Sequence, residues 1–174
     1  MMARRIIYTF VTLLVLFVAF YVTGVLAPAV YENEIEATFT DRPIDIWKNL
    51  TSLETISERK PDVVHVEQLS EDYEAVTWRE TLKNGQSRTF RVLEREAPSH
   101  FKVERFLSDD GVTGVWTYEM YEIENYTIVR VHEVSLNQNV WKRAWYTVLG
   151  RSILLRREIK ALRVSLFDRL LYTQ

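Results

Sequence analysis

The sequence predicts an α+β fold: an antiparallel sheet of about seven strands with one long C-terminal helix, preceded by a single transmembrane helix. Three observations predict it. Residues 6–27 form an uncharged apolar run, residues 62–137 divide into six short strand-like segments separated by turn residues, and from residue 140 the apolar spacing becomes that of a helix. A chain of 174 residues has room for one domain beside a membrane segment.

The N-terminal apolar run is predicted to be a membrane anchor. Its 22 residues carry no charge, and at about 1.5 Å per residue they span roughly 33 Å, the thickness of a bilayer core. Arg4 and Arg5 precede the run and three glutamates follow at 32–36, so the positive-inside rule places the N-terminus in the cytoplasm. A cleaved signal peptide is the alternative, because "APA" at 27–29 resembles a cleavage site, but the run is longer than usual for one.

We therefore expect a single-pass membrane protein with an anchor at 1–29 and an extracytoplasmic domain, on the periplasmic or extracellular side, at 30–174. The domain has no cysteine, which excludes disulfides and cysteine-based zinc or thiol chemistry. Its charge is uneven: residues 30–139 hold 12 Lys or Arg against 22 Asp or Glu, and residues 140–174 hold 8 against 2. The basic C-terminal segment is expected to attract the acidic body or, alternatively, anionic lipid headgroups.

The elements follow in a clear order. A strand is expected at 31–40, then one or two short helices at 42–58 with Thr40 or Asp41 as the N-cap and Pro43 in the first turn. The six strands of the meander are predicted at 62–69, 73–83, 86–96, 99–107, 112–123 and 126–137. From residue 140 to residue 171 the apolar spacing of three and four predicts one long amphipathic helix, with Gly150 as a weak point.

The last two strands give the sharpest expectation of register. With Glu124 and Asn125 as a two-residue turn, in which Asn125 tolerates a positive φ, Glu119 lies opposite Arg130 on a solvated face. The other face pairs Met120 with Val129, Tyr118 with Val131, and Trp116 with Glu133. Wide side chains around one carboxylate suit the lining of a pocket. The alternative is an ordinary core with Glu133 at its wet rim.

Few residues indicate chemistry. A two-residue "NG" turn at 84–85 would place Trp78 opposite Arg91 and Glu80 opposite Thr89, without settling which face is inner. Glu80 and Glu133 are the candidate carboxylates, each either a general acid or base or a hydrogen-bonded group at a cavity rim. The three histidines fall on separate predicted strands, so no metal site is expected, and without a phosphate-binding or dinucleotide motif no cofactor is expected.

This order of elements resembles the START-like helix-grip fold of the SRPBCC superfamily, which includes polyketide cyclases/dehydrases and lipid-transport proteins. The resemblance covers residues 31–172 and rests on "FTDRPIDIWKNL", "GVWTYEMYEI", "YTIVRVHEVSL" and "VWKRAWYTVLGRSILLRREIKALRVSL". It implies a curved sheet wrapped on the long helix with an apolar cavity between them. Trp116, Tyr118, Met120 and Val131 would then line the wall, and Trp145, Val148 and Leu155 the lid.

Three functions fit these expectations. The first is membrane-tethered binding or transport of an apolar or amphipathic small molecule, such as a lipid, at a site formed by Trp116, Tyr118, Met120, Val129, Val131, Glu133, Trp145, Val148 and Leu155. The second is a cyclase- or dehydrase-type enzyme that uses pocket carboxylates. The third is a non-catalytic domain that binds another protein. We favour the first, with the membrane and a hydrophobic ligand as partners, no nucleic acid, and the oligomeric state open.

Overall fold

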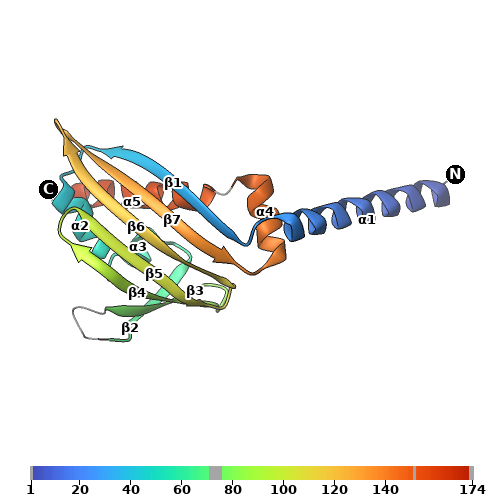
Figure 1. The fold of residues 1–174 in the computed structure, drawn as a ribbon, viewed down its shortest axis with the longest axis horizontal. Coiled ribbons are helices and arrows are strands. Elements are labelled where there is room, and N and C mark those ends of the chain that lie inside the picture. Colours follow the sequence, from blue (N-terminus) through green and yellow to red (C-terminus); the bar gives the residue numbers. More distant parts are fainter. Residues whose placement is uncertain (1, 71–75, 151, 173–174) are drawn as a thin grey trace.

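The computed structural model describes residues 2–70, 76–150 and 152–172 and confirms the predicted α+β class (Figure 1). The elements are, in chain order, α1 (Met2–Leu26), β1 (Val30–Phe39), α2 (Pro43–Thr51), α3 (Ile56–Arg59), β2 (Val63–Gln68), β3 (Thr77–Leu82), β4 (Ser87–Glu96), β5 (His100–Ser108), β6 (Val112–Ile123), β7 (Tyr126–Asn137), α4 (Val140–Leu149) and α5 (Ile153–Tyr172). The strand predicted from residue 73 is described only from Thr77, because residues 73–75 lie outside the described part.

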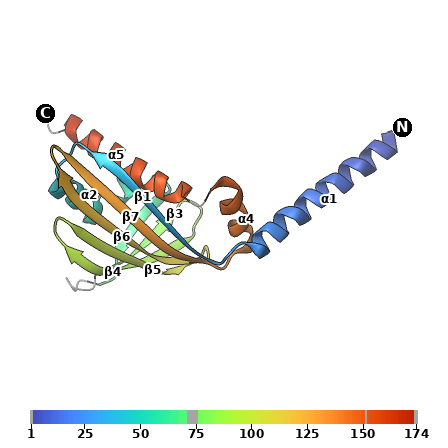
Figure 2. The same cartoon turned by 45° about the horizontal axis from the view of Figure 1, so that its top comes forward.

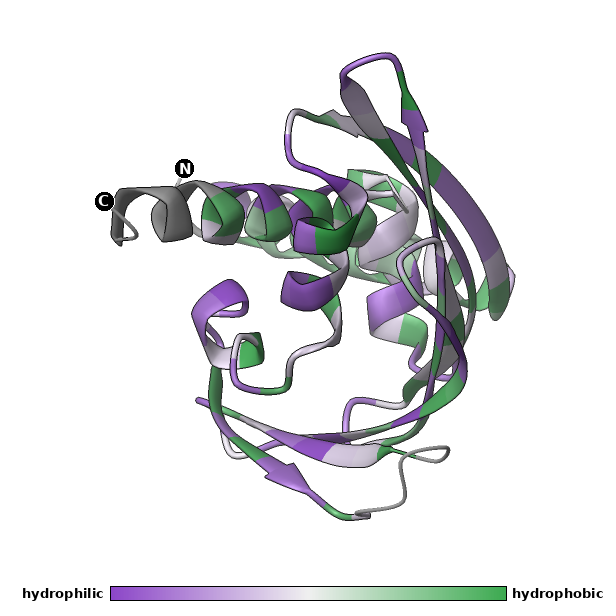
Figure 3. Cartoon of the chain, turned by 90° about the vertical axis from the view of Figure 1, so that its left-hand side faces the viewer, coloured by the Kyte–Doolittle hydropathy of each residue, from purple (hydrophilic) through white to green (hydrophobic). Residues whose placement is uncertain are grey.

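The strands form one open antiparallel sheet in the order β1-β7-β6-β5-β4-β3-β2. The register shifts twice between β4 and β5, between Thr89 and Phe90 and again between Val92 and Glu94. Each such bulge bends its strand and increases the local twist. The sheet accordingly curves around α5, and α2 and α3 lie on the same concave side (Figures 2 and 3). The helix-grip arrangement is thus confirmed.

Helix α5 contributes the central apolar stripe of the core. Leu155, Ile159, Leu162 and Leu166 recur at intervals of three and four and are all buried. Beside this stripe, the buried Asn49 of α2 donates a hydrogen bond of 2.9 Å to the Ser165 hydroxyl. Such a paired polar contact inside an apolar core fixes how the two helices lie against each other, because an unpaired amide there would be costly.

The β6–β7 hairpin has the predicted register throughout. Ile123 pairs with Tyr126, Met120 with Val129 and Tyr118 with Val131. One detail differs: the positive φ, 56°, belongs to Glu124, the first turn residue, and not to Asn125. A positive φ at the first central residue but not at the second is typical of a type II′ turn. Like type I′, this turn matches the twist of the two strands that it joins.

The β3–β4 hairpin differs from the prediction by one residue. Its loop has three residues, 83–85, and Gly85 carries a φ of 81°, so Trp78 pairs with Phe90 and Glu80 with Arg88. A three-residue loop of this kind ends in a left-handed residue that only glycine or asparagine tolerates well. The prediction of Arg91 opposite Trp78 was therefore wrong, and the register places Trp78 and Glu80 on the buried face.

Two helix predictions also need correction. Helix α2 starts after Arg42, with Pro43 in its first turn, and neither Thr40 nor Asp41 is its N-cap; Arg42 instead pairs with Asp45 at 2.8 Å. The single helix predicted for 140–171 is broken at Gly150, whose φ of 90° ends α4. The break allows α4 to turn away from the sheet and lie beside α1, which projects from the rest of the chain (Figure 1).

Helix α1 is long and apolar enough to span a membrane, with Arg4–Leu26 as the candidate span. Its large apolar side chains are exposed along most of its length. Its second half contacts α4, through aromatic contacts at Phe17 and Phe20 and a close approach at Gly24.

Candidate functional site

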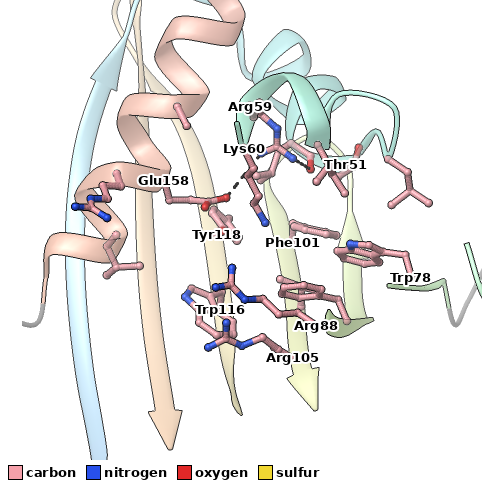
Figure 4. Close-up of a pocket in the computed structure, with 18 of the residues that line it drawn as sticks. Thr51, Arg59, Lys60, Trp78, Arg88, Phe101, Arg105, Trp116, Tyr118 and Glu158 are labelled. Carbon is pink, nitrogen blue, oxygen red and sulfur yellow. Dashed lines mark hydrogen bonds and ion pairs between the residues drawn. The ribbon is translucent and has the colours of Figure 1, made fainter. Parts of the chain in front are cut away.

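A cavity of about 840 Å³ lies between the concave face of the sheet, α3 and α5 (Figure 4). Strands β3 to β7 contribute the sheet side, and the apolar residues from α5 are Leu155, Ala161 and Val164. Its volume falls in the range of roughly 300–1,000 Å³ that is typical of sites for small organic molecules. A cavity of this size is formed because the sheet curves away from α5 at β3–β5 while it stays in contact with the helix at β1.

The sheet side of the cavity is mainly aromatic. Trp78 and Phe90 stack with ring centroids 5.1 Å apart and an angle of 11° between their planes. Phe101 and Tyr118 form a second, tilted pair at 6.0 Å. These residues alternate with outward-facing ones along their strands, so the aromatic surface follows directly from the pleat of β3 to β6.

Polar groups gather at the end of the cavity nearest α4. The guanidinium of Arg105 lies 5.1 Å from the centre of the Trp116 ring, and Arg88 lies beside it (Figure 4). Arg105 is 7% exposed, and its ionic partner Asp110 is 4.0 Å away. Burial lowers the pKa of Arg105, and the nearby Asp110 carboxylate opposes that shift. A buried cation is therefore held against an aromatic face at this end.

Glu133 belongs to the same polar end and is completely buried. Its Oε1 accepts a 2.5 Å hydrogen bond from the Ser135 hydroxyl. Burial raises the pKa of Glu133, against the opposing effects of Ser135 and Arg105. The pKa of Tyr31 is also raised, by burial and by Glu133. The centre of its ring lies 6.3 Å from the ring centre of Tyr146, a cavity-lining residue of α4.

A second polar group lies at the α3 end. Lys60 Nζ is 2.9 Å from Glu80 Oε1, which also accepts a bond from the Trp78 indole at 3.3 Å. Arg59 donates to the Leu50 carbonyl at 3.2 Å and lies 3.9 Å from Glu158. Arg59 and Lys60 each have a carboxylate partner, so their positive charges are balanced locally.

The predicted site residues divide into three groups. Trp116, Tyr118, Glu133 and Leu155 line the cavity. Met120, Val129 and Val131 are buried in the surrounding core but do not line the cavity. Trp145 and Val148 were placed wrongly: they are 53% and 63% exposed, because they lie on the side of α4 that faces away from the cavity.

Sequence reasoning missed several cavity residues, chiefly Arg59, Lys60, Arg88, Arg105, Phe90 and Phe101. One usable signal existed for Arg105. Phe101, Val103 and Arg105 alternate along β5, which puts a charged side chain on the apolar face of that strand. Phe90 and Arg88 were missed because the β3–β4 loop was taken to be one residue too short.

Among the described residues, no group of three or more His, Cys, Asp or Glu side chains is arranged to hold a metal ion. His132 and His100 instead lie near Glu32 and Glu94, at 2.6 and 2.9 Å, on the outer face. Histidine–carboxylate pairs at that distance are ordinary surface contacts.

No protein-family model and no curated protein sequence matches the chain. Solved structures match it in fold. The Zhui aromatase/cyclase from a Streptomyces species is 12% identical over 83% of this chain and 96% of that one, with a TM-score of 0.66. The chain has the START-like helix-grip fold.

Two further structures widen the comparison. The di-domain protein StfQ from the steffimycin biosynthetic pathway is 9% identical over 82% of this chain and 52% of its own, with a TM-score of 0.65. Ara h 8.0201 is 10% identical over 80% of this chain and 99% of its own, with a TM-score of 0.61. At such identities the likeness is one of fold alone.

Proposed function

We propose that the protein is membrane-tethered and binds an amphipathic, lipid-like molecule in the cavity between the sheet and α5. The observation that carries the proposal is a cavity of about 840 Å³ with an aromatic wall and a buried arginine at one end. Such a site favours a ligand with a large apolar part, because aromatic surface released from water contributes most of the binding free energy.

The charges at the two ends of the cavity suggest how the ligand lies. Its apolar part would contact Trp78, Phe90, Phe101 and Tyr118, and its polar end would lie near Arg105. A guanidinium suits a carboxylate or phosphate because its planar N–H groups can donate two parallel hydrogen bonds. An acidic headgroup at this position would complement a cation that is already desolvated.

The tether is α1. The uncharged run at residues 6–27 is long enough to hold the domain at the membrane surface, and Arg4 and Arg5 before it favour an extracytoplasmic position for the rest of the chain. A tethered domain meets its ligand at the bilayer, where an amphipathic molecule is concentrated. This supports a lipid or a lipid-like compound as the ligand.

The test is native mass spectrometry of the full chain purified in a mild detergent, with two matched variants. Val92 lines the cavity and is 8% exposed, whereas its neighbour Leu93 faces outward and is 39% exposed. We expect a co-purified or added amphipathic anion to bind the wild type and Leu93→Trp equally, and to bind Val92→Trp at least several-fold more weakly, because that indole projects into the cavity. Equal binding to both variants would refute the proposed site.

An enzyme of the cyclase or dehydrase type is the second candidate, favoured by the buried Glu133 with its raised pKa and its Ser135 contact. A carboxyl group whose pKa is raised by burial keeps its proton to a higher pH than an exposed one, which suits a general acid. Glu133→Gln separates the two functions. A carrier variant would retain the same ligand within a few-fold in affinity, whereas an enzyme variant would retain an unconverted molecule that differs in mass, for a dehydrase by one water.

A further inference from the structure

Helix α4 has two faces of opposite character. Trp141, Trp145, Val148 and Leu149 form one stripe with exposed fractions of 39%, 53%, 63% and 56%. Positions spaced by four, three and one lie on a single side of a helix. On the other side Ala144 is completely buried, and Tyr146 lines the cavity. A short surface helix that exposes two tryptophans to water needs an apolar partner.

The stripe continues onto α1. The Trp141 ring lies 5.1 Å from Phe17 and 5.3 Å from Tyr21, and the Trp145 ring lies 5.1 Å from Phe20. At Gly24 the two helices approach so closely that a Cβ atom would overlap the Val140 carbonyl oxygen. Helix α4 is thus fixed beside the second half of the helix that is apolar enough to span a membrane (Figures 1 and 2).

This contact sets the depth of α4. Phe17 precedes Leu26, the last residue of α1, by nine positions, which is about 14 Å at 1.5 Å per residue. If α1 crosses a hydrocarbon core about 30 Å thick, Phe17 lies well inside one leaflet. The Trp141 ring beside it must then lie in the same leaflet. We infer that α4 inserts its Trp141–Leu149 stripe into the leaflet on the side of the domain, as a second membrane contact. This inference rests on the tether in the proposed function.

The charges of α4 are compatible with insertion. Lys142 Nζ turns back to the Asp110 carboxylate at 3.1 Å and to the Asp110 carbonyl at 2.9 Å. Arg143 donates to the Ala27 carbonyl at 3.2 Å. Both cations point toward the protein, so the stripe meets the bilayer without burying a charge. Tryptophan and leucine are typical of the apolar face of a membrane-bound amphipathic helix.

The consequence concerns ligand exchange. Trp145 faces the membrane side and Tyr146, the next residue, lines the cavity. Helix α4 is therefore a wall one helix thick between the bilayer and the polar end of the cavity, next to Arg105. A ligand that entered the cavity beside α4 would come from the leaflet, and its headgroup would be next to the buried Arg105 guanidinium.

The absence of cysteine from the sequence makes a direct test simple. Single cysteines at Val148, at Ile123 and at Leu14 would each carry an NBD probe in the full chain, reconstituted in phosphatidylcholine nanodiscs. Ile123 is the matched control, because it is an apolar residue 52% exposed at the far hairpin of the sheet. Leu14 reports on α1. Aqueous dithionite reduces exposed probes, and doxyl-labelled phospholipid quenches those in the bilayer.

We expect the probe at residue 148 to be reduced several-fold more slowly than the probe at 123, and to be quenched by the doxyl lipid. If the probe at 14 is shielded while that at 148 reacts as fast as that at 123, α4 lies in water and the inference is wrong, although the tether stands. If the probe at 14 is reduced as fast as that at 123, α1 is not in the membrane, and the tether and this inference both fail.

Discussion

Asp110 is the centre of an ion cluster that joins three elements, and its removal gives the most direct test of the cavity's polar end. Its Oδ2 lies 3.3 Å from Arg88 of β4, 4.0 Å from Arg105 of β5 and 3.1 Å from Lys142 of α4. Its Oδ1 accepts bonds from the Ser108 hydroxyl at 2.6 Å and the Val112 amide at 3.0 Å. The carboxylate is 8% exposed, so these contacts are poorly screened by water.

The pKa of Asp110 gives the expected magnitude. Burial alone would raise it, but the Ser108 bond and the cations of Arg105, Lys142 and Arg88 lower it from 3.8 to about 2. A lowered carboxylate pKa stabilises the folded state above the unfolded pKa, and this contribution is lost as the pH falls toward the folded pKa. Asp110→Asn should therefore lower the free energy of unfolding by about 2 kcal/mol at pH 7, because the stabilised carboxylate is lost. About half of that difference should disappear by pH 3.

The assay is urea denaturation of the wild type and Asp110→Asn in the same detergent at several pH values. Asp109→Asn is the matched control, because this neighbouring carboxylate is exposed and contacts only Ser87 among the hydrogen bonds found for it. The difference between the wild type and Asp110→Asn should shrink as the pH falls. A difference that stays constant from pH 7 to pH 3 would refute the argument, because the ionised form would then contribute nothing.

Three further predictions follow from the described geometry. Burial raises the folded pKa of Glu133 above 4.5, so the wild type should lose stability relative to Glu133→Gln as the pH rises through that pKa. Urea midpoints of both proteins at pH 4.5 and pH 8 test the sign of this change. The opposite trend would show that Glu133 is ionised and well paired. Gly150→Ala should cost about 1–3 kcal/mol through strain alone, because φ is 90° with open space around the Cβ position, and an unchanged thermal midpoint would contradict this. A reporter fused after Gln174 should be active only outside the cytoplasm, and a cytoplasmic signal would overturn the predicted topology.

The sequence predicted the fold well where local signals agreed with tertiary contacts. The β6–β7 register followed from one two-residue turn, because an error of one residue would have put Tyr118 and Met120 into water. The predicted β3–β4 register was wrong because no such check was present there. Its faces mix charged and apolar residues, so the hydrophobic pattern could not correct the assumed loop length, and the Trp78–Phe90 pair in the cavity wall was missed.

The placement of Trp145 and Val148 shows a different limit. Their spacing continues the stripe of Leu155 and Ile159, so a single helix packed on the sheet was the simplest interpretation. A periodic stripe shows that a helix has an apolar partner but not which partner, and this chain offers two: the sheet and α1. Gly150 decides between them, since a φ of 90° is open to glycine at little cost and separates α4 from α5. The stripe before Gly150 then contacts the apolar surface of α1, and the stripe after it packs in the core, where Leu155 lines the cavity. One amphipathic pattern thus has two apolar partners, and the φ of 90° at Gly150 allows each half of the pattern to pack against its own partner.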